Sequence, residues 1–242
     1  MARQKASTAF DLDSDGAQCL AQVITYVRKA RSVTRPEIAT STGLSRTLAT
    51  KYIDVALELN LLQSGEVGQS TGGRAPRLLN FNSNAGAILV AELGATGFNV
   101  AASDLNGNLL GTTFTRVEIS EGPEVVLSLV ESSFDDLVVS LKIKNLWGIG
   151  IGVPGPVEFA TGLPISPPIM PGWDKFPVRE RFSTKYKVPV WVDNDVNLMA
   201  LGEHALRNDP ITNELIFVKI GSGIGAGILT HGQLHRGAQG CA

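Results

Sequence analysis

The chain has 242 residues, enough for one large domain or two ordinary ones, and 43% of them are hydrophobic. No stretch approaches ~20 consecutive apolar residues, the length of a membrane-spanning helix, and the first residues lack the apolar region of a secretory signal, so we expect a cytoplasmic protein without a membrane partner. Cys19 and Cys241 are too few for a disulfide framework or a four-cysteine zinc site.

The net charge of −2 is unevenly distributed along the chain. The first 80 residues hold ten Lys and Arg against seven Asp and Glu, whereas the remainder holds eleven against sixteen. Six basic residues and a single acid, Glu37, lie between Arg28 and Lys51. Such a basic segment indicates either contact with a polyanion or a solvated face, and charge alone does not separate the two.

The amino-terminal third begins with two predicted helices. Residues 1–15 are polar and are interpreted as a mobile tail, after which helical spacing of apolar residues predicts a first helix over Gln18–Ala30. Thr34 and Glu37 form a Thr-x-x-Glu capping box for a short second helix. Gly43 ends that helix, because glycine adopts a left-handed turn at little cost.

A third helix follows Ser45, which is placed to cap it. Its outer face is polar and basic. Two short helices joined by a glycine turn, the second with a basic outer face, indicate a helix-turn-helix. The apolar residues of the third helix recur at helical spacing and predict a buried stripe of Leu44, Leu48, Tyr52, Val55 and Leu59.

Two short strands are predicted next, at Leu61–Ser64 and Arg77–Phe81, and they complete a winged helix-turn-helix domain over residues 16–81. The tip of the wing is Gly72-Gly73-Arg74, where an arginine flanked by glycines can enter a narrow minor groove. Helical hairpins are common packing units, but this order of elements favours DNA binding. The residues expected to contact DNA are Arg35, Ser45, Arg46, Thr47, Thr50, Lys51, Gly73 and Arg74.

After a polar linker at 82–86, strands and helices alternate. The order of these elements alone supports an α/β domain with a mixed sheet. The predicted strands are Ile88–Leu93, Phe98–Leu105, Leu110–Ile119, one within WGIGIGVPGPV, and Val188–Val192. The predicted helices run from Gly122 to about Lys144, over Phe176–Tyr186, and over Val196–Leu206.

The chain resembles the ROK family of repressors, open reading frames and kinases. In the first part the resemblance rests on GLSRTLATKYIDVALELNLL and TGGRAPRLLNFN, a half that the family's regulators carry and its free-standing sugar kinases lack. In the second part it rests on ELGATGFNVAASDLNGNLLG, GIGIGVPGPVEFATG, PPIMPGW, VWVDNDVNLMALGEH and GSGIGAGILTHGQLHRGAQGCA. It implies a ribonuclease-H-like domain of the actin and sugar-kinase superfamily, with a first lobe over 87–213 and the start of a second lobe over 214–242.

The resemblance also implies what would follow Ala242. Family members continue with a Gly-x-x-Gly-His segment, a cysteine cluster that completes a zinc site, and the rest of the nucleotide lobe. We therefore expect a second lobe that is incomplete at the C-terminus, with exposed apolar strand surface and with the zinc site outside this chain. His204, His231 and His235 do not match the zinc ligand, so no metal or other cofactor is expected here.

Candidate ligand sites in the second part follow from the resemblance. Gly155, Asn194 and Asp195 are the expected sugar-binding residues, and Asp195 matches the family's catalytic base. An alternative role for Asp195 is to cap the helix that begins at Val196. Trp173 either stacks on a sugar ring or belongs to the core. The residues of two phosphate loops, expected to be vestigial, are Gly94, Thr96, Gly221, Ser222 and Gly223.

Departures from the family pattern count against phosphoryl transfer, so no catalytic residue is assigned. Family kinases have Asp-x-Gly-Gly-Thr in the first loop, where this chain has Glu92 and Ala95 at the first and fourth positions. The glutamate is one methylene longer, and the alanine methyl occupies space that a glycine would leave for phosphate. In the sugar-facing segment, Ile169 stands where family kinases commonly place an asparagine.

These features favour a sugar-responsive transcriptional regulator of carbohydrate metabolism, expected to be a repressor. Its partners would be a double-stranded DNA operator, a sugar or sugar-phosphate effector, and further copies of itself in a homodimer or higher oligomer. Two alternatives stay open: an ATP-dependent sugar kinase, and a DNA-binding protein with a vestigial sensor lobe. The winged half argues against the kinase, whereas only a ligand measurement separates the regulator from the second alternative.

Overall fold

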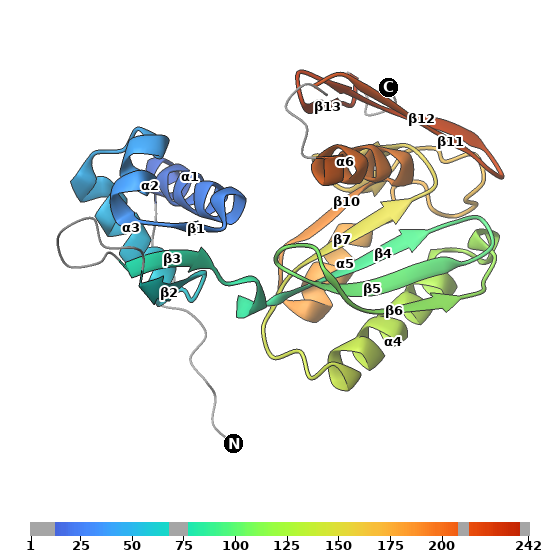
Figure 1. Ribbon diagram of the computed structural model, residues 1–242. Coiled ribbons are helices and arrows are strands. Elements are labelled where there is room, and N and C mark those ends of the chain that lie inside the picture. Colours follow the sequence, from blue (N-terminus) through green and yellow to red (C-terminus); the bar gives the residue numbers. More distant parts are fainter. Residues whose placement is uncertain (1–12, 68–76, 208–212, 238–242) are drawn as a thin grey trace. The chain divides into compact units, whose positions relative to one another are not determined.

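The computed structural model describes residues 13–67, 77–207 and 213–237 (Figure 1). They divide into two compact units, with the boundary between Ala85 and Gly86. This boundary lies within the segment expected to be a linker, where Ser83–Ala85 form one turn of 3-10 helix, η1. Across the described ranges, no helix has both the length and the apolarity needed to cross a membrane.

The N-terminal unit consists of three helices and a small antiparallel sheet. The helices are α1 (Ser14–Ala30), α2 (Arg35–Thr42) and α3 (Arg46–Glu58). The strands are β1 (Ser32–Val33), β2 (Leu62–Val67) and β3 (Arg77–Phe81), in the order β1-β3-β2. The predicted helices and hairpin are therefore present in the predicted order, whereas the two-residue strand β1 was not predicted because it is too short to show a periodic pattern.

Side-chain caps mark the starts of α1 and α2. The Asp13 carboxylate accepts the Gly16 N–H at 2.8 Å and caps α1, which begins at Ser14. The last two residues of the tail predicted over 1–15 therefore belong to this helix. The capping box at α2 is confirmed: the Thr34 N–H donates to the Glu37 carboxylate at 2.7 Å, and the Thr34 hydroxyl accepts the Glu37 N–H.

The buried face of α3 differs from the predicted stripe. The helix packs through Ala49, Tyr52, Ile53, Val55 and Ala56. The prediction that Leu48 lies in the core is wrong, because 42% of the surface of this residue is exposed to solvent. The small residues Ala49 and Ala56 allow close approach of α3 to its neighbours. The buried face is therefore turned about the helix axis relative to the predicted stripe, and Leu48 lies at the edge of that face.

A glycine turn and a strand pair organise the rest of the unit. Gly43 has a φ of 70°, in the left-handed region, as the break between α2 and α3 requires. The hairpin of β2 and β3 pairs Leu62 with Phe81, and its register shifts between Ser64 and Val67. The predicted tip of the wing, with Gly73 and Arg74, lies outside the described residues.

The second unit is built on a five-stranded mixed sheet of order β10-β7-β4-β5-β6. Its helices α4 and α5 lie on one face and α6 lies on the other (Figure 1). The strands are β4 (Ala87–Leu93), β5 (Phe98–Asp104), β6 (Leu109–Thr115), β7 (Leu146–Val153) and β10 (Val190–Asn194). The helices are α4 (Pro123–Ser140), α5 (Val178–Tyr186) and α6 (Asp195–Arg207).

Alternation of isoleucine and glycine in β7 explains why both faces of the sheet can be covered. Ile149 and Ile151 are fully buried in the core that α4 and α5 cover. Gly152 faces the other way, and a Cβ there would lie 3.3 Å from the Leu198 side chain of α6. Glycine thus allows α6 to approach the sheet closely.

Aromatic residues fill the core on the α4 and α5 side. The ring centroids of Phe134 and Phe182 lie 5.9 Å apart in an edge-to-face arrangement, and Tyr186 packs against both. Burial, followed by the hydrogen bond to Asp135, raises the pKa of the Tyr186 hydroxyl. Trp173 is also fully buried, and its Nε1–H donates to the Ile119 carbonyl at 3.2 Å, which assigns it to the core.

Several predicted boundaries move because a turn intervenes. Strand β6 ends at Thr115 instead of Ile119, since Ile119–Glu121 form the 3-10 helix η2. Helix α4 ends at Ser140, before Lys144, because Lys142 adopts a φ of 54° and the Ile143 N–H closes the turn on the Val138 carbonyl. A two-stranded ribbon that was not predicted, β8 (Val157–Glu158) with β9 (Leu163–Pro164), follows β7.

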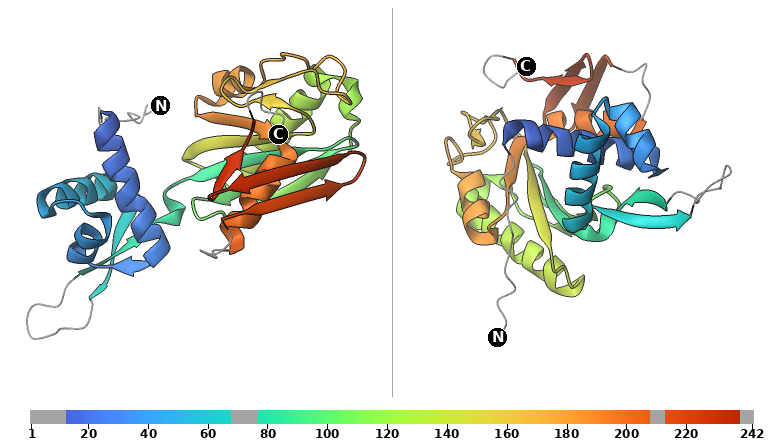
Figure 2. Two further views of the ribbon diagram at one scale, coloured as in Figure 1. Left: turned by 90° about the horizontal axis from the view of Figure 1, so that it is seen from above. Right: turned by 90° about the vertical axis from the view of Figure 1, so that its left-hand side faces the viewer.

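A second, three-stranded antiparallel sheet packs on α6. It consists of β11 (Leu215–Ile220), β12 (Ile224–Thr230) and β13 (Gln233–His235). Helix α6 lies between this sheet and the five-stranded sheet (Figures 1 and 2). A Cβ at Gly227 would lie 2.7 Å from the Val196 carbonyl oxygen, so the glycine permits the contact. The expected exposed apolar strand surface is confirmed, since the outer side chains Ile216, Val218, Ile220 and Ile224 are all exposed.

Replacing Thr34 with alanine tests the capping box. The variant loses the side-chain acceptor at the start of α2, and we expect the free energy of unfolding of the N-terminal unit to fall by about 1 kcal/mol. The Thr34 N–H, and then the Thr34 hydroxyl, donate to the Glu37 carboxylate and lower its pKa. The stabilisation from these two bonds is present above the ordinary carboxyl pKa and is lost as the pH falls through the lowered value, and the variant keeps the N–H bond and loses only the hydroxyl part. Denaturant unfolding at neutral and acidic pH measures both effects.

Thr47→Ala is the matched control, because Thr47 is exposed in the first turn of α3 and makes no side-chain hydrogen bond within the described ranges. It should leave stability and its pH dependence nearly unchanged. Equal stabilities of Thr34→Ala and the parent chain at neutral pH would contradict the assigned cap.

Candidate functional site

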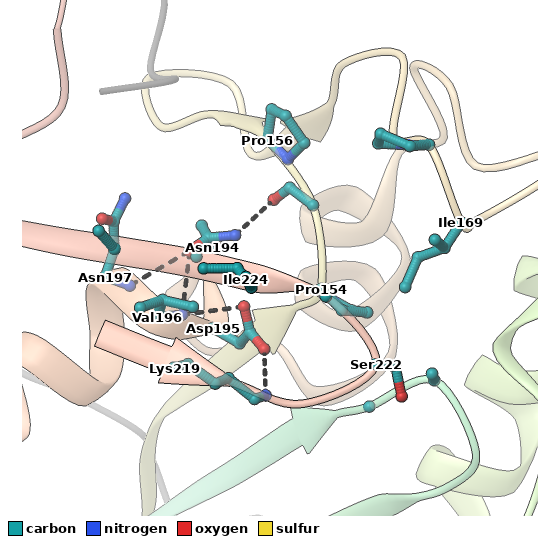
Figure 3. Close-up of a pocket in the computed structure, with 17 residues that line it drawn as sticks. Pro154, Pro156, Ile169, Asn194, Asp195, Val196, Asn197, Lys219, Ser222 and Ile224 are labelled. Carbon is teal, nitrogen blue, oxygen red and sulfur yellow. Dashed lines mark hydrogen bonds and ion pairs between the residues drawn. The ribbon is translucent and has the colours of Figure 1, made fainter. Parts of the chain in front are cut away.

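A cleft of about 550 Å³ opens at the carboxyl ends of the parallel strands β4, β7 and β10 (Figure 3). The turns that follow such strands meet at one edge of the sheet, where α/β proteins bind ligands. The β11–β12 turn closes the cleft from the second sheet. The lining residues are Gly94, Ala95, Pro154, Gly155, Pro156, Pro168, Ile169, Asn194, Asp195, Val196, Asn197, Lys219, Ser222, Gly223, Ile224, Gly225 and Ala226.

Asn194 organises the start of α6. Its amide oxygen accepts the N–H groups of Val196 at 2.9 Å and Asn197 at 3.3 Å, while its amide nitrogen donates to the Gly155 carbonyl at 3.1 Å. The capping role considered for Asp195 therefore falls mainly to Asn194, and Asp195 only shares the Val196 N–H. Through Asn194, the loop after β7 and the first turn of α6 form one wall of the cleft (Figure 3).

Asp195 lies at the floor of the cleft in an ion pair. Its side chain is 4% exposed, and its Oδ2 accepts from the Lys219 ammonium at 2.6 Å. The same ammonium lies 3.7 Å from Glu92 Oε1 of β4. Lys219 thus lies between the carboxylates of Glu92 and Asp195. Asp195, the residue that matches the family's catalytic base, already forms an ion pair with it.

Asp193, two residues earlier, makes the corresponding pair on the other side of the strand end. Its side chain is 1% exposed, Arg236 Nε donates to its Oδ2 at 2.9 Å, and the guanidinium forms an ion pair with the same oxygen, with Nη2 at 2.9 Å. Asn197 donates to the other oxygen at 3.2 Å, and the Arg236 guanidinium lies 3.7 Å above the Phe159 ring. Burial of a carboxylate requires such a partner.

Sequence reasoning missed both of these cations. A buried aspartate in Asp193-Asn194-Asp195 signals that a cation must be near, but not which one. Lys219 lies 24 residues after Asp195, on β11 of the second sheet, and Arg236 lies 43 residues after Asp193, directly after β13. Only the packing of that sheet on α6 brings them to the aspartates.

The two glycine turns lie at opposite walls of the cleft. Gly94 lines it and donates its N–H to the Gly97 carbonyl at 2.8 Å, whereas Thr96 is not among the lining residues. Ser222 and Gly223 line the facing wall, and Gly221, outside the lining, donates to the Gly223 carbonyl. The structure therefore brings most of the predicted phosphate-loop residues to one cavity.

The loops that were predicted to face a sugar place mainly apolar side chains at the cleft. Ile169 lines the cleft with an exposed apolar side chain, while Met170 and Trp173 behind it are buried. A Cβ at Gly155 would lie 2.7 Å from the Pro167 side chain, so this position accepts only glycine without movement. The polar side chains that line the cleft are Asn194, Asp195, Asn197, Lys219 and Ser222, of which the first two are the residues predicted from the sequence.

On the N-terminal unit, the predicted DNA-contacting side chains of α3 are exposed as a group. Arg46, Thr47, Thr50 and Lys51 all face solvent, and the Ser45 hydroxyl accepts the Leu48 N–H at 3.3 Å as the predicted cap. Arg35 is exposed too, but its guanidinium forms an ion pair with Asp54. Gly73 and Arg74 fall outside the part of the chain that the structure describes.

No metal centre is apparent in the described ranges, which contain no group of three or more His, Cys, Asp or Glu side chains placed to hold an ion. His231 is highly exposed beside Glu214, and His204 is half-buried on α6.

Comparison with known proteins identifies relatives that are named as repressors and relatives that are named as sugar kinases. The model of the ROK family matches residues 88–242. The xylose repressor of Caldicellulosiruptor bescii is 30% identical over 225 residues, which cover 91% of this chain and 55% of the repressor. The chain thus spans about half the length of the curated relatives that it matches.

Two crystal structures show the fold. A ROK family transcriptional regulator, described as a homologue of the E. coli MLC protein, has a TM-score of 0.78 at 20% identity and covers 95% of this chain and 58% of its own. A ROK family glucokinase from Streptomyces griseus, in complex with glucose and AMPPNP, has a TM-score of 0.58 at 23% identity and covers 65% of this chain and 48% of its own. The second unit thus has the sugar-kinase-like fold. Because the family model covers more than half of the chain, the chain belongs to the ROK family.

Proposed function

We propose that the chain is the DNA-binding and sugar-sensing part of a sugar-responsive transcriptional repressor. The observation that carries this proposal is the presence, in one chain, of an exposed basic helix in a small helical unit and a hydroxyl-binding cleft in a sugar-kinase-like domain. Similarity to a xylose repressor over 91% of the chain supports it, because that similarity extends across both units.

The N-terminal unit has the parts of a winged helix-turn-helix. Helices α2 and α3 are joined by the left-handed turn at Gly43, and the hairpin of β2 and β3 takes the place of the wing. The first turn of a recognition helix supplies the contacts to base edges in the major groove. In α3 this turn carries Arg46 and Thr47, and both residues are exposed.

The effector would bind in the cleft beside Asn194 and Asp195. A carboxylate and an amide can accept and donate to adjacent hydroxyl groups, and the Gly155 backbone borders the same space. A neutral sugar and a sugar phosphate both fit this description, and xylose is the first candidate by the name of the relatives. An operator with two half-sites would require a homodimer or higher oligomer.

A sugar kinase is the second candidate, favoured by Asp195 in the cleft and by the fold shared with a glucokinase. Three observations weigh against it. The Asp195 carboxylate is paired with Lys219 at 2.6 Å, which opposes its use as a proton acceptor. Glu92 and Ala95 alter the first phosphate loop, where phosphoryl transfer depends on positioning.

Arg46→Ala tests the assignment of a base-reading residue. An operator is first selected from random DNA duplexes with the parent chain, and binding is then measured on that operator and on random duplex. The variant should lose about 1–3 kcal/mol on the selected operator and much less on random DNA. Equal losses on both would remove Arg46 from the base-reading class.

Lys51→Ala tests the phosphate contacts and serves as the counterpart of Arg46→Ala. We expect similar weakening on all sequences, together with a salt dependence that is shallower by about one unit. The Lys51 ammonium lies 5.2 Å from the Tyr52 ring, so the unfolding temperature of the variant is measured in parallel. Selective weakening on the operator alone would assign Lys51 to base reading instead.

The kinase alternative predicts a different result and is tested separately. We expect no ATP-dependent phosphorylation when the chain is incubated with a panel of hexoses and pentoses under coupled-assay conditions. Glu214→Gln, at an exposed carboxylate next to His231, is the control for Asp195→Asn. Sugar turnover that persists in Glu214→Gln and disappears in Asp195→Asn would establish the kinase and refute this part of the proposal.

A further inference from the structure

Arg35 and Asp54 form an ion pair on the surface of the N-terminal unit. The Arg35 Nη2 lies 2.8 Å from Asp54 Oδ1, and the two side chains keep 40% and 51% of their exposure. Arg35 is the first residue of α2, whose start is fixed by the capping box of Thr34 and Glu37. The ion pair therefore joins a fixed point of α2 to the outer face of α3.

Asp54 shares that outer face with residues proposed to meet DNA. Thr50 and Lys51 precede it by four and three residues, and side chains at these spacings are neighbours on a helix surface. All three side chains are exposed. A free carboxylate at this position would repel phosphate groups and would also attract the Lys51 ammonium away from them.

The other cations of the face have no such partner. Across the described ranges, neither Arg46 nor Lys51 forms an ion pair, so both remain available to a polyanion. Arg35 differs, since its charge is matched by Asp54. With the ion pair intact, Arg46 and Lys51 make the outer face of α3 positive. Without Arg35, that face also carries the negative charge of Asp54 with no cation to balance it.

We infer that Arg35 is a positioning residue that neutralises Asp54, and that it does not make the direct contact with DNA that was expected of it from the sequence. The inference rests on the proposed DNA-binding function and deepens it. Arg35 joins the start of α2 to α3 and neutralises the Asp54 carboxylate beside the residues proposed to contact DNA. Asp54 in turn sets an upper limit on how tightly the face binds DNA of any sequence.

The test is a double-mutant cycle on the whole chain. Binding to a short random-sequence DNA duplex is measured by fluorescence anisotropy over a range of salt concentrations. Arg35→Ala should weaken binding about 3- to 10-fold, the effect of exposing one like charge near the phosphates. In the Asp54→Asn background the same replacement should change affinity by less than about twofold, with an unchanged salt dependence.

Two controls accompany the cycle. Lys29→Ala removes a charge from an exposed lysine on α1, and its effect should be the same with and without Asp54→Asn. Unfolding temperatures are measured for every variant. If Arg35→Ala does not fold, Arg35→Gln replaces it, because the longer amide preserves packing while removing the charge.

The possible results separate the alternatives. Equal weakening in both backgrounds, with a salt slope shallower by about one unit, would mean that Arg35 contacts phosphate directly and would overturn the inference. No effect of Arg35→Ala in either background would overturn it as well. Failure of the parent chain to bind any duplex at low salt would instead refute the proposed function itself.

Discussion

Two carboxylates are withdrawn from water where β10 meets α6, and their pairing constrains the rest of the second unit. Asp193 and Asp195 are almost fully buried, and buried carboxylates are costly unless cations meet them. Lys219 supplies one cation from β11, and Arg236 supplies the other from the residue that follows β13. Charge pairing and the close packing of Gly227 on α6 therefore hold that sheet in place, and the cleft is the space left between it and the five-stranded sheet.

The same pairing favours sensing over catalysis. Asp195 already accepts from the Lys219 ammonium, so a ligand hydroxyl that donates to it must share the carboxylate with β11. On the proposed function, sugar binding would act directly on the position of the second sheet. An effector changes an equilibrium only when it binds two conformations unequally, and an ion pair between two elements is a contact on which such a difference can depend.

Features that depend on neighbouring residues could be predicted from the sequence. The capping box of Thr34 and Glu37 and the Gly43 break needed only local patterns. The succession of most strands and helices along the chain followed from the spacing of apolar residues. Features that join distant segments could not. The partners of Asp193 and Asp195 lie on another sheet, and Asp54 became the partner of Arg35 only through the packing of α2 on α3.

Coupling between sugar binding and DNA binding within one chain is measured by a titration. The selected operator duplex is held at partial saturation with the protein, and xylose and other sugars are added while anisotropy is followed. The account predicts that at least one sugar lowers DNA affinity about 5- to 150-fold, and that Asp195→Asn abolishes this response while leaving sugar-free DNA binding intact. DNA affinity unaffected by every sugar, or a response that persists in Asp195→Asn, would contradict it.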